Sequence, residues 1–172
     1  MNNIVLVGFM AVGKTTIGKS LKGIFGYSLF DVDSLIEKVE KIPISEIFSQ
    51  KGETYFRTKE VEVAKKLLSR NNNIISTGGG LFLNEEVRKM ALKNNFVVFL
   101  DLDINEVYNR VNRNNLRPLA KGKGLEDLKA LYDSRLQYYL EANVRIDTNK
   151  KTPKQIAEEI KEYYYKWLNK EL

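Results

Sequence analysis

The octapeptide Gly8-Phe9-Met10-Ala11-Val12-Gly13-Lys14-Thr15 matches the pattern G-x-x-x-x-G-K-[ST] between a short apolar run and a run of helical periodicity. The glycines of such a loop let the backbone curl until its N–H groups point inward at phosphates. The lysine then reaches the β- and γ-phosphates, and the following helix adds its positive end. A strand–helix turn with an incidental lysine is the alternative, and the flanking runs disfavour it. The pattern therefore predicts an ATP site contacted by Ala11, Val12, Gly13, Lys14, Thr15 and Thr16.

Outward from this loop, apolar runs of strand length alternate with stretches of helical periodicity. The predicted strands are 4–7, 28–32, 74–76, 96–100 and 144–147, and the predicted helices are 14–24, 54–69, 85–93, 125–140 and 153–168. Ser34-x-x-Glu37, Asp103-x-x-Glu106 and Thr152-Pro153 are helix-start patterns. The alternation predicts an α/β fold with a parallel sheet between two layers of helices. Without an internal repeat or a long linker, residues 1–172 are expected to form one domain.

The composition restricts the chemistry. The 172 residues include neither cysteine nor histidine, so disulfides, thiol nucleophiles, imidazole bases and Cys/His zinc sites are excluded. The net charge of +6 favours either anionic substrates or nucleic acid, and the absence of a long basic run favours the former. Because the sequence shows no signal peptide and no apolar run of bilayer length, we expect a cytoplasmic protein.

Two carboxylates follow the second predicted strand. Asp31 and Asp33 alternate along an extended segment, so both are expected to face the phosphate loop at the carboxyl edge of the sheet. One would hold magnesium through water, together with the Thr15 hydroxyl, and the other would contact the group that is phosphorylated. The alternative is that Asp33 or Ser34 caps the next helix.

A second set of residues suits a small anion. Arg57 and Glu60 lie one helical turn apart, where Glu60 can orient Arg57 for a bidentate grip on a carboxylate, although many such pairs are surface pairs. The run Gly78-Gly79-Gly80 closes the third strand. Three successive glycines indicate that the backbone comes very close to a ligand, as the floor of a second-substrate pocket would.

Further arginines lie in or near the polar, glycine-containing stretch 113–124, which suits a lid. Arg117 in this stretch can close over ATP and neutralise charge on the transferred phosphoryl group. Arg110, upstream, can stack on adenine. Arg135, on the next predicted helix, has the alternative of simply covering the surface with its stem.

Together these residues resemble the shikimate kinase family. The shared elements, in order and spacing, are Gly8…Gly13-Lys14-Thr15, Phe30-Asp31-Val32-Asp33, Gly52-Glu53…Phe56-Arg57, Gly78-Gly79-Gly80, Arg117-Pro118-Leu119 and Arg135. The resemblance extends from Ile4 to about Ile160, and the ordered set is far more specific than any one motif. Two positions differ from the family pattern, which usually has glycine in place of Ala11 and leucine in place of Ala120.

The resemblance implies a three-layer P-loop kinase fold with a five-stranded parallel core, a substrate-binding insertion at about 34–61 and a lid at about 112–124. It implies transfer of the γ-phosphoryl group of ATP to the 3-hydroxyl of shikimate, giving shikimate 3-phosphate and ADP on the route to chorismate and aromatic amino acids. Mg²⁺ is the implied cofactor. We expect a monomer that binds neither nucleic acid nor membrane.

The resemblance also implies individual roles. Asp33 contacts the reacting hydroxyl, while Arg57 and Arg135 hold the carboxylate of shikimate and the Gly79 backbone, flanked by Gly78 and Gly80, contacts a ring hydroxyl. Lys14 and Arg117 stabilise the phosphates. The residues implied around the adenine are Arg110, Lys151 and Pro153, of which Lys151 stands at a variable position.

Two other functions remain open at this point. A small P-loop kinase for gluconate or a nucleoside monophosphate would share the phosphate loop, and gluconate also has a carboxylate. An ATP-binding module acting on nucleic acid would use the net charge of +6.

Overall fold

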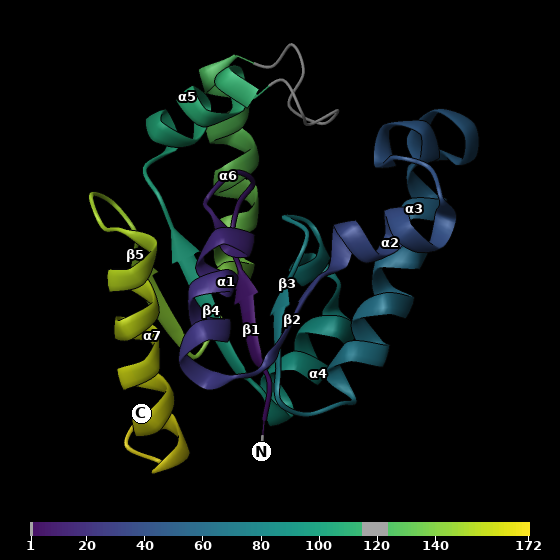
Figure 1. Ribbon diagram of the computed structural model, residues 1–172. Helices are drawn as coiled ribbons and strands as arrows, with labels where there is room; N and C mark the ends of the chain where they lie inside the picture. Colours follow the sequence, from purple (N-terminus) through teal and green to yellow (C-terminus); the bar gives the residue numbers. More distant parts are fainter. Residues whose placement is uncertain (1, 115–123) are drawn as a thin grey trace.

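The computed structural model describes residues 2–114 and 124–172. Within these ranges the chain forms a five-stranded, all-parallel sheet in the order β2-β3-β1-β4-β5 (Figure 1). The strands are β1 (Ile4–Val7), β2 (Ser28–Asp31), β3 (Asn73–Ser76), β4 (Phe96–Asp101) and β5 (Val144–Asp147). β1 and β3 are buried along their whole length, as the apolar runs of a sheet covered on both faces require. The predicted fold class is confirmed.

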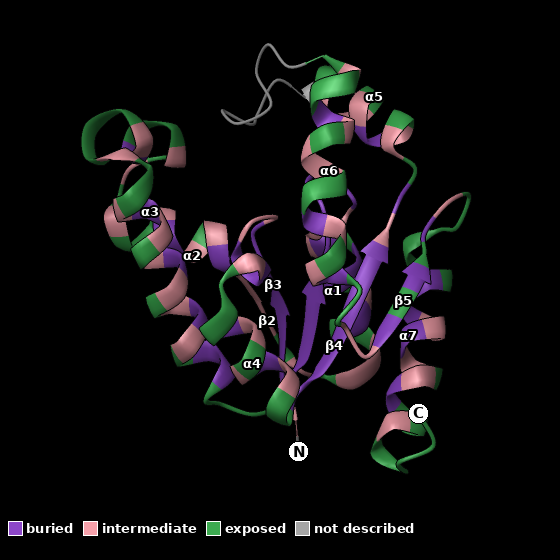
Figure 2. Cartoon of the chain, turned by 180° about the vertical axis from the view of Figure 1, so that it is seen from behind, coloured by how far each residue is buried: buried purple, intermediate pink, exposed green. Residues whose placement is uncertain are grey.

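Helices cover both faces of this sheet. The described helices are α1 (Lys14–Phe25), α2 (Val32–Glu40), α3 (Ile44–Leu68), α4 (Glu85–Asn94), α5 (Ile104–Asn114), α6 (Leu125–Tyr139), α7 (Pro153–Leu168) and the 3-10 helix η1 (Leu81–Leu83). α1 and α7 pack together on one face, and α4 and α6 lie on the other, with the buried strands between them (Figure 2). None of the helices in the described ranges combines the length and the apolar character needed to cross a bilayer.

The end of the chain follows its predicted helix start. Thr152 accepts a hydrogen bond from the Gln155 N–H over 3.3 Å, and the Gln155 side chain accepts one from the Thr152 N–H over 2.9 Å. Pro153 occupies the first helical position, where its missing N–H has no cost. α7 then buries Ile156 and Ile160 against the core.

The start of α2 differs from the prediction. Asp31, not Asp33 or Ser34, is the cap, because its Oδ1 accepts a hydrogen bond from the Ser34 N–H over 3.1 Å. The helix therefore begins at Val32, and Asp33 lies in its first turn rather than on an extended segment. The argument from strand alternation was wrong for Asp33. Glu37 also acts elsewhere, accepting from the Ile44 N–H at the start of α3 over 2.9 Å.

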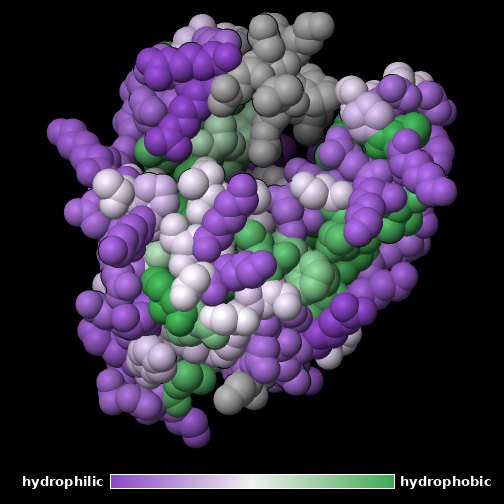
Figure 3. All heavy atoms as spheres, viewed as in Figure 1, coloured by the Kyte–Doolittle hydropathy of each residue, from purple (hydrophilic) through white to green (hydrophobic). Residues whose placement is uncertain are grey.

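α3 begins ten residues before its predicted start at residue 54, at Ile44, and it kinks at Gly52. Gly52 has φ 81° and ψ 167°, a conformation that breaks the helical pattern used to predict the element. α2 and α3 form an arm beyond the carboxyl ends of the strands (Figure 1). Phe48 and Phe56 meet across the kink with ring centroids 4.9 Å apart, and apolar residues gather where the arm joins the body (Figure 3). The kink therefore turns one long helix into a wall of a cavity.

Candidate active site

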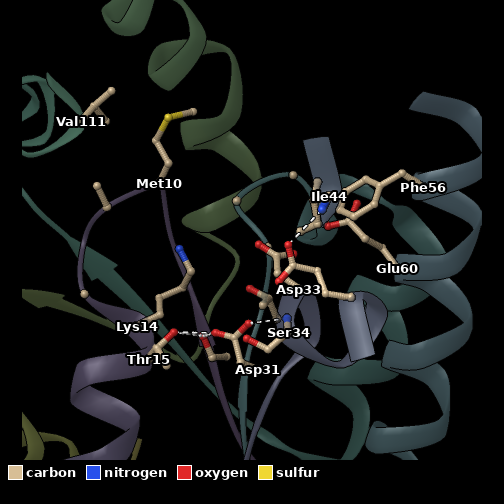
Figure 4. A pocket seen from close by; sticks show the side chains of 18 of the residues that line it. Met10, Lys14, Thr15, Asp31, Asp33, Ser34, Ile44, Phe56, Glu60 and Val111 are labelled. Carbon is tan, nitrogen blue, oxygen red and sulfur yellow. Dashed lines mark hydrogen bonds between the residues drawn. The ribbon is translucent and has the colours of Figure 1, made fainter. Parts of the chain in front are cut away.

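A cavity of about 600 Å³ lies between this arm and the phosphate loop. Figure 4 shows side chains from the phosphate loop, α1, β2, α2 and α3 converging on it. The residues predicted from the sequence that line it are Ala11, Gly13, Lys14, Thr15, Thr16, Asp31, Asp33, Arg57, Gly78, Gly79, Gly80, Arg110 and Arg135. Val12 is a buried residue of the loop, and Lys151 and Pro153 are exposed and do not line the cavity. Arg117, most of the predicted lid and Ala120 lie outside the described residues.

The phosphate loop has the conformation that its glycines predict. Gly8 has φ 141°, and a Cβ there would lie 2.5 Å from the Leu100 carbonyl, so the loop can pack on β4 only with glycine. Ala11 has φ 58°, a left-handed conformation that costs an L-residue about 1 kcal/mol and that glycine adopts freely. The loop thus keeps this geometry with alanine where the family pattern has glycine. The buried Lys14 curls back over it and donates to the Gly8 and Phe9 carbonyls over 2.9 and 2.7 Å.

Three oxygens meet beside this loop. Thr15 Oγ1 donates to Asp31 Oδ2 over 2.5 Å, and the Ser76 hydroxyl donates to the same carboxylate oxygen over 3.0 Å. Among the described residues, no group of three or more Asp, Glu, His or Cys side chains is placed to hold a metal. Mg²⁺ bound with phosphates needs no such cage, because it keeps waters and takes one or two protein oxygens. Thr15 and Asp31 therefore fit magnesium. Ser76 was missed by the sequence analysis, although it ends a strand at this edge.

A buried carboxylate lies on the arm side of the cavity. Glu60 is 1% exposed and pairs with Arg57 over 2.5 Å, so this pair is not a surface pair. Glu53 binds the same guanidinium from outside, over 3.0 Å. A Cβ on Gly78 would lie 2.9 Å from Asp33 Oδ1 and would clash with Glu60 Oε1. Asp33 and Glu60 therefore converge on one point, which only glycine leaves open (Figure 4).

Burial raises the pKa of Glu60 to about 7, against the attraction of Arg57. Burial also acts against the charge of Arg57, but Glu60 and Glu53 outweigh it and raise the Arg57 pKa. Arg57 thus stays charged, while Glu60 takes up a proton near neutral pH.

This titration predicts a pH-dependent stability. Between the ordinary value of 4.5 and a folded value of about 7, the folded state holds one more proton than the unfolded state. The free energy of unfolding therefore falls as the pH rises through this window. Glu60→Gln removes the effect, so from about pH 5.5 to about pH 8 the parent should lose about 2 kcal/mol relative to the variant. Urea unfolding of both proteins at the two pH values measures it. Glu62→Gln, which changes an exposed carboxylate on the same helix and leaves Glu60 in place, should lose the same amount of stability as the parent.

The glycine run brings the other arginine into the cavity. Arg135 is 8% exposed and donates from Nη1 to the Gly79 carbonyl over 3.2 Å, so the surface alternative for Arg135 was wrong. Its guanidinium lies 5.6 Å from the centroid of the Phe9 ring. A Cβ on Gly80 would lie 3.0 Å from Arg57 Nη1. The close approach predicted for the glycines is thus an approach to two arginines and two carboxylates.

Arg110 of α5 contacts the phosphate loop and lines the cavity. It donates to the Ala11 carbonyl over 3.2 Å and pairs with Glu106 over 2.9 Å. Lys151 pairs instead with Glu159 over 2.7 Å. Two apolar lining residues that the sequence analysis did not single out are Ile44 and Phe48. Their signal was the amphipathic start of α3, which Gly52 conceals.

Comparisons with known proteins agree with this arrangement. The family model described as "Shikimate kinase" matches residues 10–165. A shikimate kinase of Sulfurihydrogenibium sp. is 43% identical over 160 residues, covering 93% of this chain and 96% of that protein. The structure of a shikimate kinase from Acinetobacter baumannii in complex with shikimate is similar with a TM-score of 0.92 and 32% identity, over 96% of this chain and 93% of that one. That of the Aquifex aeolicus shikimate kinase has a TM-score of 0.82 and 34% identity, over 95% and 96% of the two chains.

Proposed function

Because the chain belongs to the shikimate kinase family, an ATP-dependent group of kinases that phosphorylate a shikimate hydroxyl, we propose that the cavity between the arm and the phosphate loop carries out this reaction with the residues described above. One observation supports the proposal most strongly: the phosphate loop and the set Asp33, Arg57, Gly79 and Arg135 line the same cavity of about 600 Å³. The γ-phosphate of ATP and a small hydroxylated anion can therefore meet in it.

On the acceptor side, shikimate offers one carboxylate and three hydroxyls. Arg57 and Arg135 bind the carboxylate, since both guanidinium groups border the Gly79–Gly80 peptide. Asp33 binds the 3-hydroxyl and orients it toward the phosphate loop. The arm, residues 34–61, supplies an apolar wall, and the ring of shikimate packs against this wall. These assignments make the arm the substrate-binding insertion.

On the nucleotide side, the loop from Ala11 to Thr16 binds the phosphates and Lys14 exchanges its two loop carbonyls for phosphate oxygens. Arg110 lies beside the nucleotide, and Pro153 and Lys151 close the adenine end. Thr15 and Asp31 would hold Mg²⁺, Asp31 through water, and the ion would supply positive charge beside the phosphates. Arg117 acts with the lid over 112–124.

The hydroxyl oxygen forms a bond to the γ-phosphorus as the bond to the β-phosphate oxygen breaks, and ADP leaves. Asp33 accepts the hydroxyl proton and releases it to water. Positioning and charge stabilisation provide the catalysis, and no covalent enzyme intermediate is needed. The enzyme acts as a monomer, and its positive charge attracts the two anionic substrates rather than nucleic acid.

The test of the function is ADP release with three acceptors in parallel. Shikimate should support turnover, and gluconate and nucleoside monophosphates should not. Turnover with gluconate alone would overturn the acceptor assignment. Salt-sensitive retention of a labelled oligonucleotide, with ATP hydrolysis stimulated by it, would instead favour an activity on nucleic acid.

Asp33→Asn tests the role of the carboxylate within this reaction. The amide keeps the shape but removes the charge and the basicity, so we expect kcat to fall by about 10²-fold to 10⁴-fold. The KM for ATP should change little. Asp33 borders Glu60 and the acceptor side of the cavity, whereas the nucleotide is bound by the loop. Loss of ATP binding with an unchanged kcat would assign Asp33 to the nucleotide site.

A further inference from the structure

The carbonyl of Gly79 is held from one side by two side chains of α6. Arg135 donates to it from Nη1 over 3.2 Å, and the Tyr139 hydroxyl donates a short hydrogen bond to the same oxygen. Tyr139 is 0% exposed, and its ring stacks on Phe99 of β4 with centroids 5.2 Å apart and an interplanar angle of 25°. The core therefore fixes the phenol ring, and the hydrogen bond from its hydroxyl fixes the Gly79 carbonyl at the floor of the cavity.

The peptide between Gly79 and Gly80 is enclosed on three sides. A Cβ on Gly79 would lie 3.4 Å from the Met10 backbone nitrogen in the phosphate loop, and one on Gly80 would lie 3.0 Å from Arg57 Nη1. In a planar trans peptide the carbonyl and the next N–H point in opposite directions. Holding the Gly79 carbonyl against α6 therefore also fixes the direction of the Gly80 N–H. This one peptide is thus contacted by Arg135 and closely approached by Arg57.

We propose that Tyr139 is a positioning residue for the acceptor: its hydroxyl holds the Gly79–Gly80 peptide where Arg57 and Arg135 face one carboxylate. This inference rests on the proposed function. Tyr139 and Arg135 donate to the same Gly79 oxygen. Arg135 uses only Nη1 in this contact, so its other N–H groups remain for a ligand. Arg135 Nε is buried and has no hydrogen-bond partner among the described residues, which suits a donor reserved for a ligand.

The phenol acts as a fixed donor in this arrangement. Burial raises the pKa of Tyr139 to about 12, so its hydroxyl stays protonated throughout the pH range of an assay. The proposed effect is accordingly independent of pH near neutrality. This separates it from the titration of Glu60.

α6 itself provides a matched control. Tyr132 lies one heptad before Tyr139, on the helix face that also carries Leu128 and Arg135. Its hydroxyl donates to Asp101 Oδ1 at the end of β4 over 2.7 Å, away from the glycine run, and its ring meets Phe9 edge to face. Each tyrosine thus makes one hydroxyl bond from α6 to the body of the protein. Replacement by phenylalanine keeps both rings and removes only that bond.

The experiment compares Tyr139→Phe with Tyr132→Phe in full steady-state kinetics and thermal unfolding. We expect both variants to lose a similar, small amount of stability. Tyr139→Phe should raise the KM for shikimate about fivefold to tenfold, the loss of roughly one hydrogen bond. Its KM for ATP should stay unchanged and its kcat should stay within about twofold. Tyr132→Phe should leave all three kinetic constants unchanged.

A double-mutant cycle with Arg135→Ala completes the test. If Tyr139 acts through Arg135 and the peptide beside it, Tyr139→Phe should raise the KM much less in the Arg135→Ala background. Equal KM values for the parent and Tyr139→Phe, or full additivity in the cycle, would overturn the proposal. Partial unfolding cannot imitate the result, because it lowers kcat and leaves KM unchanged. A Tyr139→Phe chain with no folded fraction would also refute it, making the phenol a requirement of the core. Failure of the parent to phosphorylate shikimate would instead refute the proposed function.

Discussion

Replacement of Lys14 by alanine should lower kcat about a thousandfold and leave a folded protein. Lys14 is the residue of the phosphate loop whose charge reaches the transferred phosphoryl group, and removal of one such donor typically costs about 10²-fold to 10³-fold. The loss also removes two hydrogen bonds to the Gly8 and Phe9 carbonyls, which water entering the cavity can replace. Unfolding by heat should therefore occur within a few degrees of the parent. Single-turnover measurements with ATP and shikimate test the rate.

The matched control is Lys22→Ala, which removes the same charge from the exposed last turn of α1. It should leave kcat within about twofold, since the charge lies at the far end of the helix. Near-normal turnover by a folded Lys14→Ala enzyme would contradict the assignment of residues 8–15 as a phosphate-binding loop. A similar loss in both variants would point to the overall charge and not to a phosphate contact.

Loss of Arg57 or Arg135 should have the largest effect on acceptor binding. If both guanidinium groups hold one carboxylate, removing either leaves a buried anion poorly paired, at a cost of about 2–5 kcal/mol. Arg57→Ala and Arg135→Ala should each raise the KM for shikimate by roughly 30-fold to several thousandfold, and that for ATP only slightly. The double variant should lose less than the sum of the two, because the arginines share one ligand group. Steady-state kinetics with each substrate varied in turn measure both KM values for the parent and for each variant.

Arg→Lys at either position should rescue only in part, since an ammonium cannot reproduce the planar fork. An esterified shikimate, which has no carboxylate charge, should be a poor substrate of the parent and respond little to either substitution. Arg145→Ala is the control, because that arginine is exposed on β5 and pairs with Asp101. Equal discrimination against the ester by the parent and both alanine variants would show that Arg57 and Arg135 do not recognise the carboxylate.

The fold was largely predictable because local patterns and tertiary structure agree. β1 and β5 and the helix Pro153–Leu168 have the bounds that their apolar runs and caps predict. The errors lie where a backbone conformation depends on something outside the pattern. Asp31 ends a strand and caps a helix at once, which moved Asp33 into a helical turn. Gly52 has a non-helical conformation inside α3. An analysis of periodicity therefore places the start of the helix after Gly52 and not at Ile44.

The site was predictable in its motifs and not in its internal contacts. Residue types at motif spacing indicated Lys14, Arg57 and the glycines, since their chemistry requires those types. The bonds from Ser76 to Asp31 and from Tyr139 to Gly79 join residues 45 and 60 positions apart. No local signal marks such partners, because a serine at a strand end and a tyrosine on a helix are ordinary core or edge residues. Only the sheet order brings them together.

That sheet order also affects how the chain folds. The central strand β1 is synthesised first, yet Ile4 pairs with Ile74 on one side and with Phe96 on the other. The entropy cost of closing loops of this length is met before the strands can pair, which makes parallel sheets slow to form. At about 5–20 residues per second, β1 leaves the ribosome roughly 5–20 s before β4 is complete. Until β4 is complete, one edge of this entirely apolar strand has no partner, which makes the nascent chain prone to aggregation.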